Sequence, residues 1–383
     1  MSTYRQNMMT RALGNKIYAN RRLAVTDPDW TCCECIYIFR KMTDEEWMAK
    51  ALAEARKGIG KTAPNPPVGA VMVKDGELLG AGWHHGAGLP HAEVEAISAA
   101  IAKHGEGCLK GATAYVTLEP CSTTGRTPAC TDGLIAAGIS RVVYACQDPN
   151  PLHAGAADDV LEKAGIEVQA GVLEDSCGEI LRPFSKVQRT GLPWVIWKCA
   201  MSLDGKITRP EGEGQWLSGE ESRADVQRLR ADVDAIMTSG ETVRADKPAL
   251  TIRVPELLEG RNQPWRVVIT DKKETMPVEA ALFSDGWRAR TLVRSGVDLD
   301  MVLRNLVREQ GVLSVMIEAG GNFSAAMIAA GFVDEAVIYQ APMLCGATVP
   351  ALQGKGFAQS VRLAGMTYER IGNDTKIRGL LVK

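Results

Sequence analysis

Apolar residues recur along the chain with two periods, one typical of helices and one typical of strands. From Trp47 to Ala55 they follow helical spacing, and Thr43 with Glu46 forms the capping-box pattern that begins a helix. Two apolar runs, at 68–73 and 78–83, then flank the dipeptide Asp75-Gly76. Because this dipeptide favours a two-residue turn, the segment is predicted to form a β-hairpin.

Strand and helix patterns alternate beyond this hairpin. Strands are predicted at 114–118, 141–145 and 166–172, and helices at 91–102, 131–137 and 157–164. Gly138 and Gly165 stand where helix C-terminal caps belong. Strands that are separated by helices of this length pair in parallel, so residues 42–188 are predicted to form a three-layer α/β domain.

A second domain is predicted over residues 189–383, after the linker Thr190-Gly191-Leu192-Pro193. Its strands are expected at 194–200, 235–239, 266–270, 291–294, 314–318 and 335–340, and its helices at 220–230, 300–309 and 323–330. Two further strands, 366–371 and 376–382, flank the turn Gly372-Asn373. The pattern predicts a largely parallel α/β sheet that is closed by an antiparallel hairpin.

The composition narrows the class of protein. The 383 residues carry a net charge of −2 and 45% hydrophobic residues, with no apolar run of the ~18 residues that a membrane helix needs. Ten cysteines are too few for a disulfide scaffold of this length. We therefore expect a cytoplasmic enzyme with no membrane or nucleic-acid partner. Residues 1–41 lack a clear period and are expected to be an extension without function, with the enzyme proper beginning at Met42.

Candidate chemistry in the first domain lies in two short segments. His91 precedes a predicted helix, Cys121 follows a strand, and Cys130 begins the next helix. One imidazole and two thiolates suit zinc and leave its fourth position open for water, as in catalytic sites. Glu93 lies two residues from His91 and is placed to carry a proton. The alternative is that both cysteines are core residues and His91 only caps a helix.

Several segments together resemble the bifunctional riboflavin-biosynthesis deaminase–reductase family. The pairing of His91-Ala92-Glu93 with Pro120-Cys121 is similar to the zinc-deaminase signature, although the cysteines are eight residues apart. The other segments that carry the resemblance are Gly60-Lys61-Thr62-Ala63-Pro64-Asn65-Pro66-Pro67-Val68-Gly69, Tyr115-Val116-Thr117-Leu118-Glu119-Pro120-Cys121-Ser122, Gly125-Arg126-Thr127-Pro128 and Asp148-Pro149-Asn150-Pro151. The resemblance covers residues 42–383 and implies a cytidine-deaminase-like domain followed by a dihydrofolate-reductase-like domain.

The resemblance implies roles for residues of the first domain. His91, Cys121 and Cys130 would hold Zn²⁺, and Glu93 would be catalytic. The reaction would be deamination of 2,5-diamino-6-ribosylamino-4(3H)-pyrimidinone 5′-phosphate. Asn65, His84 and Lys61 would contact this substrate, or would be only turn and surface residues.

The second domain lacks the glycine pattern of a Rossmann dinucleotide site but has Gly320-Gly321 between a strand and a helix. Its resemblance to the same family rests on segments such as Gln215-Trp216-Leu217-Ser218-Gly219 and Leu250-Thr251-Ile252-Arg253. The resemblance implies NADPH reduction of 5-amino-6-(5-phosphoribosylamino)uracil to its ribitylamino form. NADPH would be lined by Ala200, Trp216, Thr242, Asp246, Gly320, Gly321, Asn322, Phe323, Ser324, Ala325 and Ala326, and the substrate by Gly214, Arg230, Leu250, Arg253 and Glu318.

Three positions depart from the family pattern, and alternatives stay open. Thr123 replaces a histidine, Gly214 a serine and Lys247 an aspartate, which puts substrate detail in doubt. The helix with Arg230 could instead be a solvated charged face, and Asp204, Lys198 or solvent could donate the reductase proton. A relative that keeps only the zinc deaminase, a scaffold that has lost one activity, and more distantly a nucleic-acid base deaminase are the competing interpretations. A homo-oligomer is expected.

Overall fold

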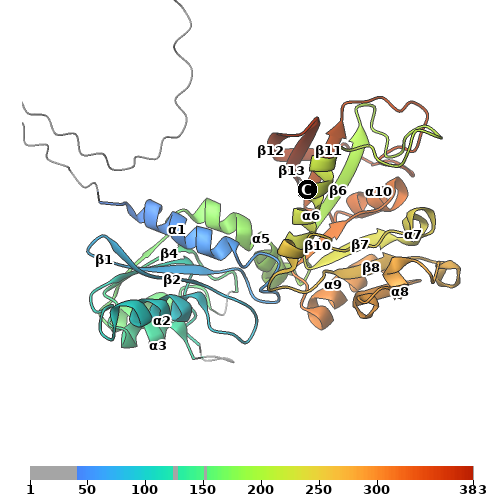
Figure 1. Ribbon diagram of the computed structural model, residues 1–383. Helices are drawn as coiled ribbons and strands as arrows, with labels where there is room; N and C mark the ends of the chain where they lie inside the picture. The colour runs from blue at the N-terminus through green and yellow to red at the C-terminus, as the bar shows by residue number, and fades with distance from the viewer. Residues whose placement is uncertain (1–40, 124–127, 151–152, 383) are drawn as a thin grey trace, which may run out of the picture. The chain divides into compact units, whose positions relative to one another are not determined.

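The computed structural model of the protein describes residues 41–123, 128–150 and 153–382 (Figure 1). The chain divides into two units, Met1–Lys41 and Met42–Lys383. The prediction for residues 1–41 lies, except for Lys41, outside the described residues, as do motif residues 125–127 and Pro151. All of the described residues other than Lys41 thus belong to the second unit.

The first half of this unit is built on a five-stranded sheet of order β2-β1-β3-β4-β5. β1 pairs antiparallel with β2 and β3, whereas β3, β4 and β5 are parallel. The strands are β1 (Gly69–Lys74), β2 (Glu77–Trp83), β3 (Thr113–Leu118), β4 (Arg141–Cys146) and β5 (Glu167–Ala170). The helices are α1 (Asp44–Arg56), α2 (Ala92–His104), α3 (Cys130–Ala136), α4 (Ala156–Lys163) and α5 (Glu174–Thr190).

Helices cover both faces of this sheet, which confirms the three-layer prediction (Figure 1). α1 and α5 pack on one face through Met48 and Leu181, and α2, α3 and α4 pack on the other through side chains such as Ala96 and Leu134. The predicted capping box begins α1, since Thr43 Oγ1 accepts from the Glu46 N–H at 3.3 Å. These contacts hold the ends of β3 and the starts of α2 and α3 in fixed positions.

The second half has an eight-stranded sheet of order β12-β13-β11-β6-β10-β7-β8-β9. Its strands are β6 (Trp194–Ser202), β7 (Ala235–Ser239), β8 (Trp265–Ile269), β9 (Thr291–Arg294), β10 (Ser314–Ile317), β11 (Glu335–Ala341), β12 (Arg362–Ile371) and β13 (Asp374–Val382). Its helices are α6 (Glu220–Asp232), α7 (Gly240–Asp246), α8 (Ala281–Ser284), α9 (Leu299–Gln310) and α10 (Gly321–Ala329). Short 3₁₀ turns occur at η1 (Pro255–Leu258), η2 (Lys273–Thr275) and η3 (Arg288–Arg290).

This sheet is parallel from β11 through β6, β10, β7 and β8 to β9, and β13 pairs antiparallel with β11. The β12–β13 hairpin closes it, as predicted from Gly372-Asn373. One face is covered by α9 and α10, with Leu306 and Met327 in the core, and the other by α6, α7 and α8, with Val226 and Leu282. Both halves therefore have the predicted α/β architecture.

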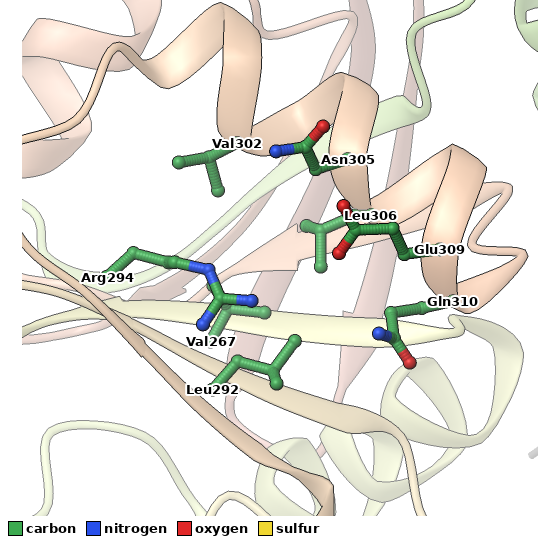
Figure 2. Close-up of a pocket in the computed structure, with 8 residues that line it drawn as sticks. All are labelled: Val267, Leu292, Arg294, Val302, Asn305, Leu306, Glu309 and Gln310. Atoms are coloured by element: carbon green, nitrogen blue, oxygen red, sulfur yellow. The ribbon is translucent and has the colours of Figure 1, made fainter.

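A small hollow lies between α9 and strands β8 and β9 (Figure 2). Its volume of about 10 Å³ is room for one water molecule. Val267 and Leu292 form its floor, and Asn305 and Glu309 of α9 stand along its opposite wall. None of the residues predicted for either site lines it. None of the described helices combines the length and the apolar run that crossing a bilayer requires.

Candidate metal centre and reductase site

Three elements bring His91, Cys121 and Cys130 together in the first half. His91 is the N-cap residue of α2, Cys121 lies in the loop after β3, and Cys130 is the first residue of α3. The His91 Nδ1 atom lies 3.2 Å from the Cys130 sulfur and 3.5 Å from the Cys121 sulfur. All three potential ligand atoms lie within 4.8 Å of one another.

These spacings fit a tetrahedral zinc ion. Bonds of about 2.0–2.3 Å at tetrahedral angles place two ligand atoms roughly 3.5–3.8 Å apart. The observed separations of 3.2 Å and 3.5 Å are close to that range. Among the described residues, this is the one His/Cys/Asp/Glu group that could hold a metal ion. With three protein ligands, the donor set leaves a fourth position for water, as catalytic zinc sites do.

The two cysteines shift the pKa of each other's thiol in opposite directions. A hydrogen bond from the Cys130 thiol, together with His91 and the Cys130 backbone N–H, lowers the pKa of Cys121 to about 4. The Cys121 sulfur and burial in turn raise the pKa of Cys130. The hydrogen bond between the His91 ring and the Cys121 sulfur raises the pKa of His91. The cluster therefore already concentrates negative charge on sulfur, which is the form that binds metal.

Glu93 stands in the first turn of α2 with only 3% of its surface exposed. Burial raises the pKa of its carboxyl group to about 7, and the charge on Cys121 acts in the same direction. Its carboxyl group also interacts with the Cys130 thiol. The residue is therefore beside the cluster rather than out in solvent, as its two-residue spacing from His91 predicted.

Glu119 anchors the segment that carries Cys121. It is buried, and its carboxylate accepts hydrogen bonds from the backbone N–H groups of Asp148, Gly155 and Ala157 at 3.0–3.1 Å. These bonds tie the end of β3 to the start of α4. Sequence reasoning missed this role of Glu119, because nothing in a single sequence distinguishes an acid that binds backbone from an exposed one.

Asn65 and His84 also meet near the cluster. Asn65 Nδ2 lies 2.9 Å from His84 Nε2, and His84 Nδ1 lies 3.0 Å from the carbonyl oxygen of Pro90, the residue before His91. Since a carbonyl only accepts, Nδ1 carries the proton and Nε2 accepts from Asn65. Burial lowers the pKa of His84, which keeps the ring neutral. His84 is only 3% exposed and binds the Pro90 carbonyl oxygen, so it supports the His91 segment, and its contact with substrate stays a prediction.

In the second half, charged side chains gather at the end of β10. The Arg230 guanidinium of α6 binds Glu318, at the end of β10, through two hydrogen bonds of 2.8 Å and 3.1 Å. Lys198 of β6 approaches the same carboxylate at 3.8 Å. Burial opposes ionisation of Glu318, but Arg230 and Lys198 outweigh it and lower the pKa to about 2.

This geometry overturns the alternative of a solvated face for Arg230, because its side chain is only 12% exposed. The third nitrogen of the Arg230 guanidinium, Nη1, donates to the carbonyl oxygen of Thr251 at 2.9 Å. Arg253 is exposed, and its guanidinium makes no hydrogen bond or ion pair with any residue in the described ranges. Leu250, three residues earlier, is 3% exposed and adopts a left-handed φ of 50°.

The predicted cofactor turn lies between β10 and α10. Gly320 is the N-cap residue of α10, and its N–H donates to Thr242 Oγ1 at 3.0 Å. Gly321 cannot carry a side chain, since a Cβ would lie 2.6 Å from the Pro350 carbonyl oxygen. Asn322 and Ala326 are exposed and Phe323 is half-buried, whereas Ser324 and Ala325 face the interior. Of the residues in the first turn of α10, Asn322 is thus the exposed one, and binding of NADPH at this turn stays a prediction.

The other positions predicted to line NADPH lie on β6, at the end of α7 and in the loop before α6. Trp216 is 54% exposed, with the Arg223 guanidinium 5.2 Å from its ring. Ala200 lies half-buried on β6, and Asp246 ends α7, where burial raises its pKa. The roles of these residues in binding NADPH stay predictions.

The three residues that depart from the family pattern, Thr123, Gly214 and Lys247, differ in their local structure. Gly214 has a φ of 93°, a conformation that a serine there would adopt only with strain. Lys247 is the C-cap residue of α7, in the left-handed region, and pairs with Glu279 at 2.5 Å. Thr123 is exposed at the edge of the described segment. Only Gly214 thus has a backbone reason for its identity.

Taken together, a partly buried His/Cys/Cys cluster on one α/β sheet and a Gly-Gly turn on another, whose sheet also carries the Arg230–Glu318 pair, define a zinc deaminase joined to a reductase. Residues 41–146 match the cytidine and deoxycytidylate deaminase zinc-binding region, and residues 193–377 match the RibD C-terminal domain. The first matched segment contains β1 to β4, and the second contains β6 to β12 and the start of β13.

Whole-chain relatives have the same two parts. The chain is 42% identical to riboflavin biosynthesis protein RibD of Escherichia coli, over 82% of this chain and 93% of that protein. It is 38% identical to the RibD of Bacillus amyloliquefaciens, over 88% and 96% of the two chains. The structure of Acinetobacter baumannii RibD aligns with a TM-score of 0.80 at 36% identity, covering 89% of this chain and 99% of that one.

A deaminase/reductase from Thermotoga maritima aligns with a TM-score of 0.78 at 29% identity, covering 88% and 99% of the two chains. The chain belongs to the RibD family. It is a bifunctional deaminase–reductase of riboflavin biosynthesis that uses Zn²⁺ and NADPH.

Proposed function

We propose that the first domain deaminates 2,5-diamino-6-ribosylamino-4(3H)-pyrimidinone 5′-phosphate and that the second reduces the resulting 5-amino-6-(5-phosphoribosylamino)uracil to its ribitylamino form. The Thermotoga maritima relative is described as a diaminohydroxyphosphoribosylaminopyrimidine deaminase and 5-amino-6-(5-phosphoribosylamino)uracil reductase. The observation that carries the proposal for this chain is the convergence of His91, Cys121 and Cys130 beside the buried Glu93. We assign these residues as the metal ligands and the catalytic acid–base.

The deaminase step follows from the placement of these residues. Zinc, when bound, supplies Lewis-acid activation of a water molecule at neutral pH. The Glu93 carboxylate takes the proton from the attacking water and delivers it to the amino nitrogen that leaves as ammonia. Burial of Glu93 excludes bulk water from this transfer. Asn65 and His84 fix the loop before His91 and line the substrate pocket.

The reductase step depends on positioning. NADPH, when bound against the first turn of α10, supplies the hydride that reduces C1 of the ring-opened ribosyl group. Arg253, whose guanidinium fork has no partner within the described ranges, is available for the substrate phosphate. Arg230 holds the Glu318 carboxylate in place for the substrate rather than gripping phosphate, because its own donors bind Glu318 and Thr251.

Lys198 is better suited than Asp204 to provide the proton of this reduction. Asp204 accepts hydrogen bonds from Ser202 Oγ and from the backbone of Cys345 and Gly346. The Ser202 hydrogen bond, with these backbone donors, lowers the Asp204 pKa to about 2, so the carboxyl group carries no proton near neutral pH. The Lys198 ammonium lies beside Glu318 in the substrate region and has protons to give.

We assign residues 42–188 to the deaminase domain and 189–383 to the reductase domain, with residues 1–41 as an extension outside both. We also propose that the enzyme is a cytoplasmic homo-oligomer. Within the described part of the chain, β12 ends the sheet order with an unpaired edge, and its Tyr368 is 68% exposed, which suits pairing with a second copy. The seven cysteines of the described residues are free, as in a reducing compartment. Light scattering on the purified chain tests the oligomer, and a monomer at all concentrations would refute it.

Anaerobic incubation with the diaminopyrimidine ribosylamino phosphate, followed by mass spectrometry, tests both activities. Without NADPH, we expect ammonia and the deaminated product. With NADPH, we expect the ribitylamino product and one NADPH oxidised for each molecule reduced. Deamination without NADPH oxidation would refute the substrate assigned to the reductase domain. If the zinc-loaded protein carries out neither reaction, the substrates assigned to both domains are wrong.

A further inference from the structure

The segment from residue 247 to residue 254 connects α7 to η1 without helix or strand, and it carries Leu250 and Arg253. A single buried side chain holds its centre. Gln263, which is 2% exposed, accepts from the Ile252 N–H at 2.7 Å and donates to the Ile252 carbonyl oxygen at 2.8 Å. One amide thus satisfies both backbone groups of Ile252, as a neighbouring strand would in a sheet.

Side chains from two other elements hold the residues on either side. Gln227 of α6, which is 5% exposed, accepts from the Arg253 N–H at 2.8 Å. Arg266 of β8 donates to the Ala249 carbonyl oxygen at 3.1 Å. The segment therefore has the hydrogen bonds of an ordered element, but they come from outside it.

We propose that Gln263 and Gln227 are positioning residues that fix Arg253 for the phosphorylated substrate of the reductase. The proposal rests on the proposed function, in which Arg253 contacts the substrate phosphate. The Arg253 guanidinium makes no hydrogen bond or ion pair among the described residues, and its charge acts on Glu318 only at longer range, so the position of its backbone limits where that charge can lie. Holding that backbone before substrate arrives removes an ordering cost from binding.

The chemistry of the amide explains why glutamine suits position 263. It needs one acceptor for the Ile252 N–H and one donor for the Ile252 carbonyl oxygen. Glutamate would place a charged oxygen against that carbonyl, and an apolar residue would leave both groups buried and unpaired. Gln263→Met keeps a similar length while removing both hydrogen bonds.

The test measures reductase kinetics with purified 5-amino-6-(5-phosphoribosylamino)uracil and NADPH in the full-length, zinc-loaded enzyme. Gln263→Met is expected to raise the KM for this substrate roughly tenfold with kcat changed less than about twofold. The deaminase constants of the same variant should stay at wild-type values. Gln227→Met should act in the same direction and serves if Gln263→Met does not fold.

A double-mutant cycle shows whether the effect passes through Arg253. In the Arg253→Ala background, Gln263→Met should raise KM little further, because the group that it positions is gone. Val302→Ala on the opposite face of the sheet is the control for lost stability, since it lowers Tm by creating a cavity far from the segment. Its KM should match the wild type.

The possible results distinguish a failure of the proposed reductase function from a failure of the positioning role of Gln263 and Gln227. If the wild type does not reduce the uracil substrate, the proposed function fails and this proposal fails with it. If the wild type reduces it but Gln263→Met raises KM by the same factor with and without Arg253, only the positioning role is wrong. The positioning role is also wrong if KM is unchanged in both glutamine variants, or if Val302→Ala raises KM by as much as they do.

Discussion

At the scale of single residues, we expect the deaminase half to depend on Glu93 and the reductase half on Glu318. Both are buried acids next to basic or metal-binding groups, yet their surroundings act in opposite directions. Glu93 has no cation close enough, among the described residues, to outweigh its burial, whereas Glu318 accepts two hydrogen bonds from Arg230. Glu93 can therefore exchange a proton near neutral pH, whereas Glu318 stays ionised as a fixed charge.

Glu93→Gln should abolish deamination while zinc content stays at the wild-type level. The amide fills the same space but cannot accept and return the proton of the attacking water, a loss typically worth 10²–10⁴-fold in rate or more. Ammonia release and elemental analysis measure the two quantities, and NADPH-dependent reduction in the same variant is the control. Deamination at more than about a tenth of the wild-type rate would show that Glu93 does not have this role.

The pH dependence of stability provides a test for Glu318. Its pKa falls from 4.5 to about 2 on folding, so the ionised form stabilises the folded state above pH 4.5. This stabilisation should disappear as the pH falls from 4.5 towards 2. Thermal unfolding of wild type and Glu318→Gln from pH 8 to pH 3 measures it. The difference in Tm should be constant above pH 5 and shrink below it, and shrinkage between pH 5 and pH 8 would contradict the assignment.

At the scale of elements, hydrophobic period and turn residues predicted almost every helix and strand of both sheets. α5, α7 and α8 were not predicted. In α5, Gly178 and Pro183 interrupt the helical pattern and only Cys177 and Leu181 are buried, whereas α7 and α8 have only 7 and 4 residues. The metal ligands were predictable because their residue types are rare and specific. The Arg230–Glu318 pair was not, since 88 residues separate its members and only the fold brings them together.

Asp374 shows how a remote element completes a helix. α6 begins at Gly219, which has no side chain to cap it, and buried Asp374 of β13 accepts from the Gly219 N–H at 2.8 Å and from Ser222 Oγ at 2.6 Å. Asp374→Ala should therefore lower the stability of the reductase domain by about 1–3 kcal/mol. Chemical denaturation measures the loss, and Asp374→Asn, which keeps one acceptor oxygen, should lose less. Equal losses in the two variants would mean that capping is not the cause.

At the scale of the whole molecule, two sheets with separate cores hold the two sites. The metal cluster belongs to the first sheet alone, because its members come from α2, α3 and the loop after β3. Nothing in the described geometry of the Gly320 turn or the Arg230–Glu318 pair involves these residues. The two activities should therefore respond separately to loss of metal.

Removal of zinc by a chelator should abolish deamination and leave reduction of the uracil substrate within about twofold of its starting rate, a change worth less than ~0.5 kcal/mol in barrier. Cys121→Ser should also abolish deamination and spare reduction, without any chelator. This substitution removes one of the three proposed zinc ligands and the sulfur that accepts from the Cys130 N–H. Cys108→Ser is the matched control, since that free cysteine lies outside the cluster. Restored deamination after zinc is returned to the chelated wild type, but not to Cys121→Ser, would establish ligation. A parallel fall of both activities in Cys121→Ser would instead mean that the cluster supports the fold of the entire chain.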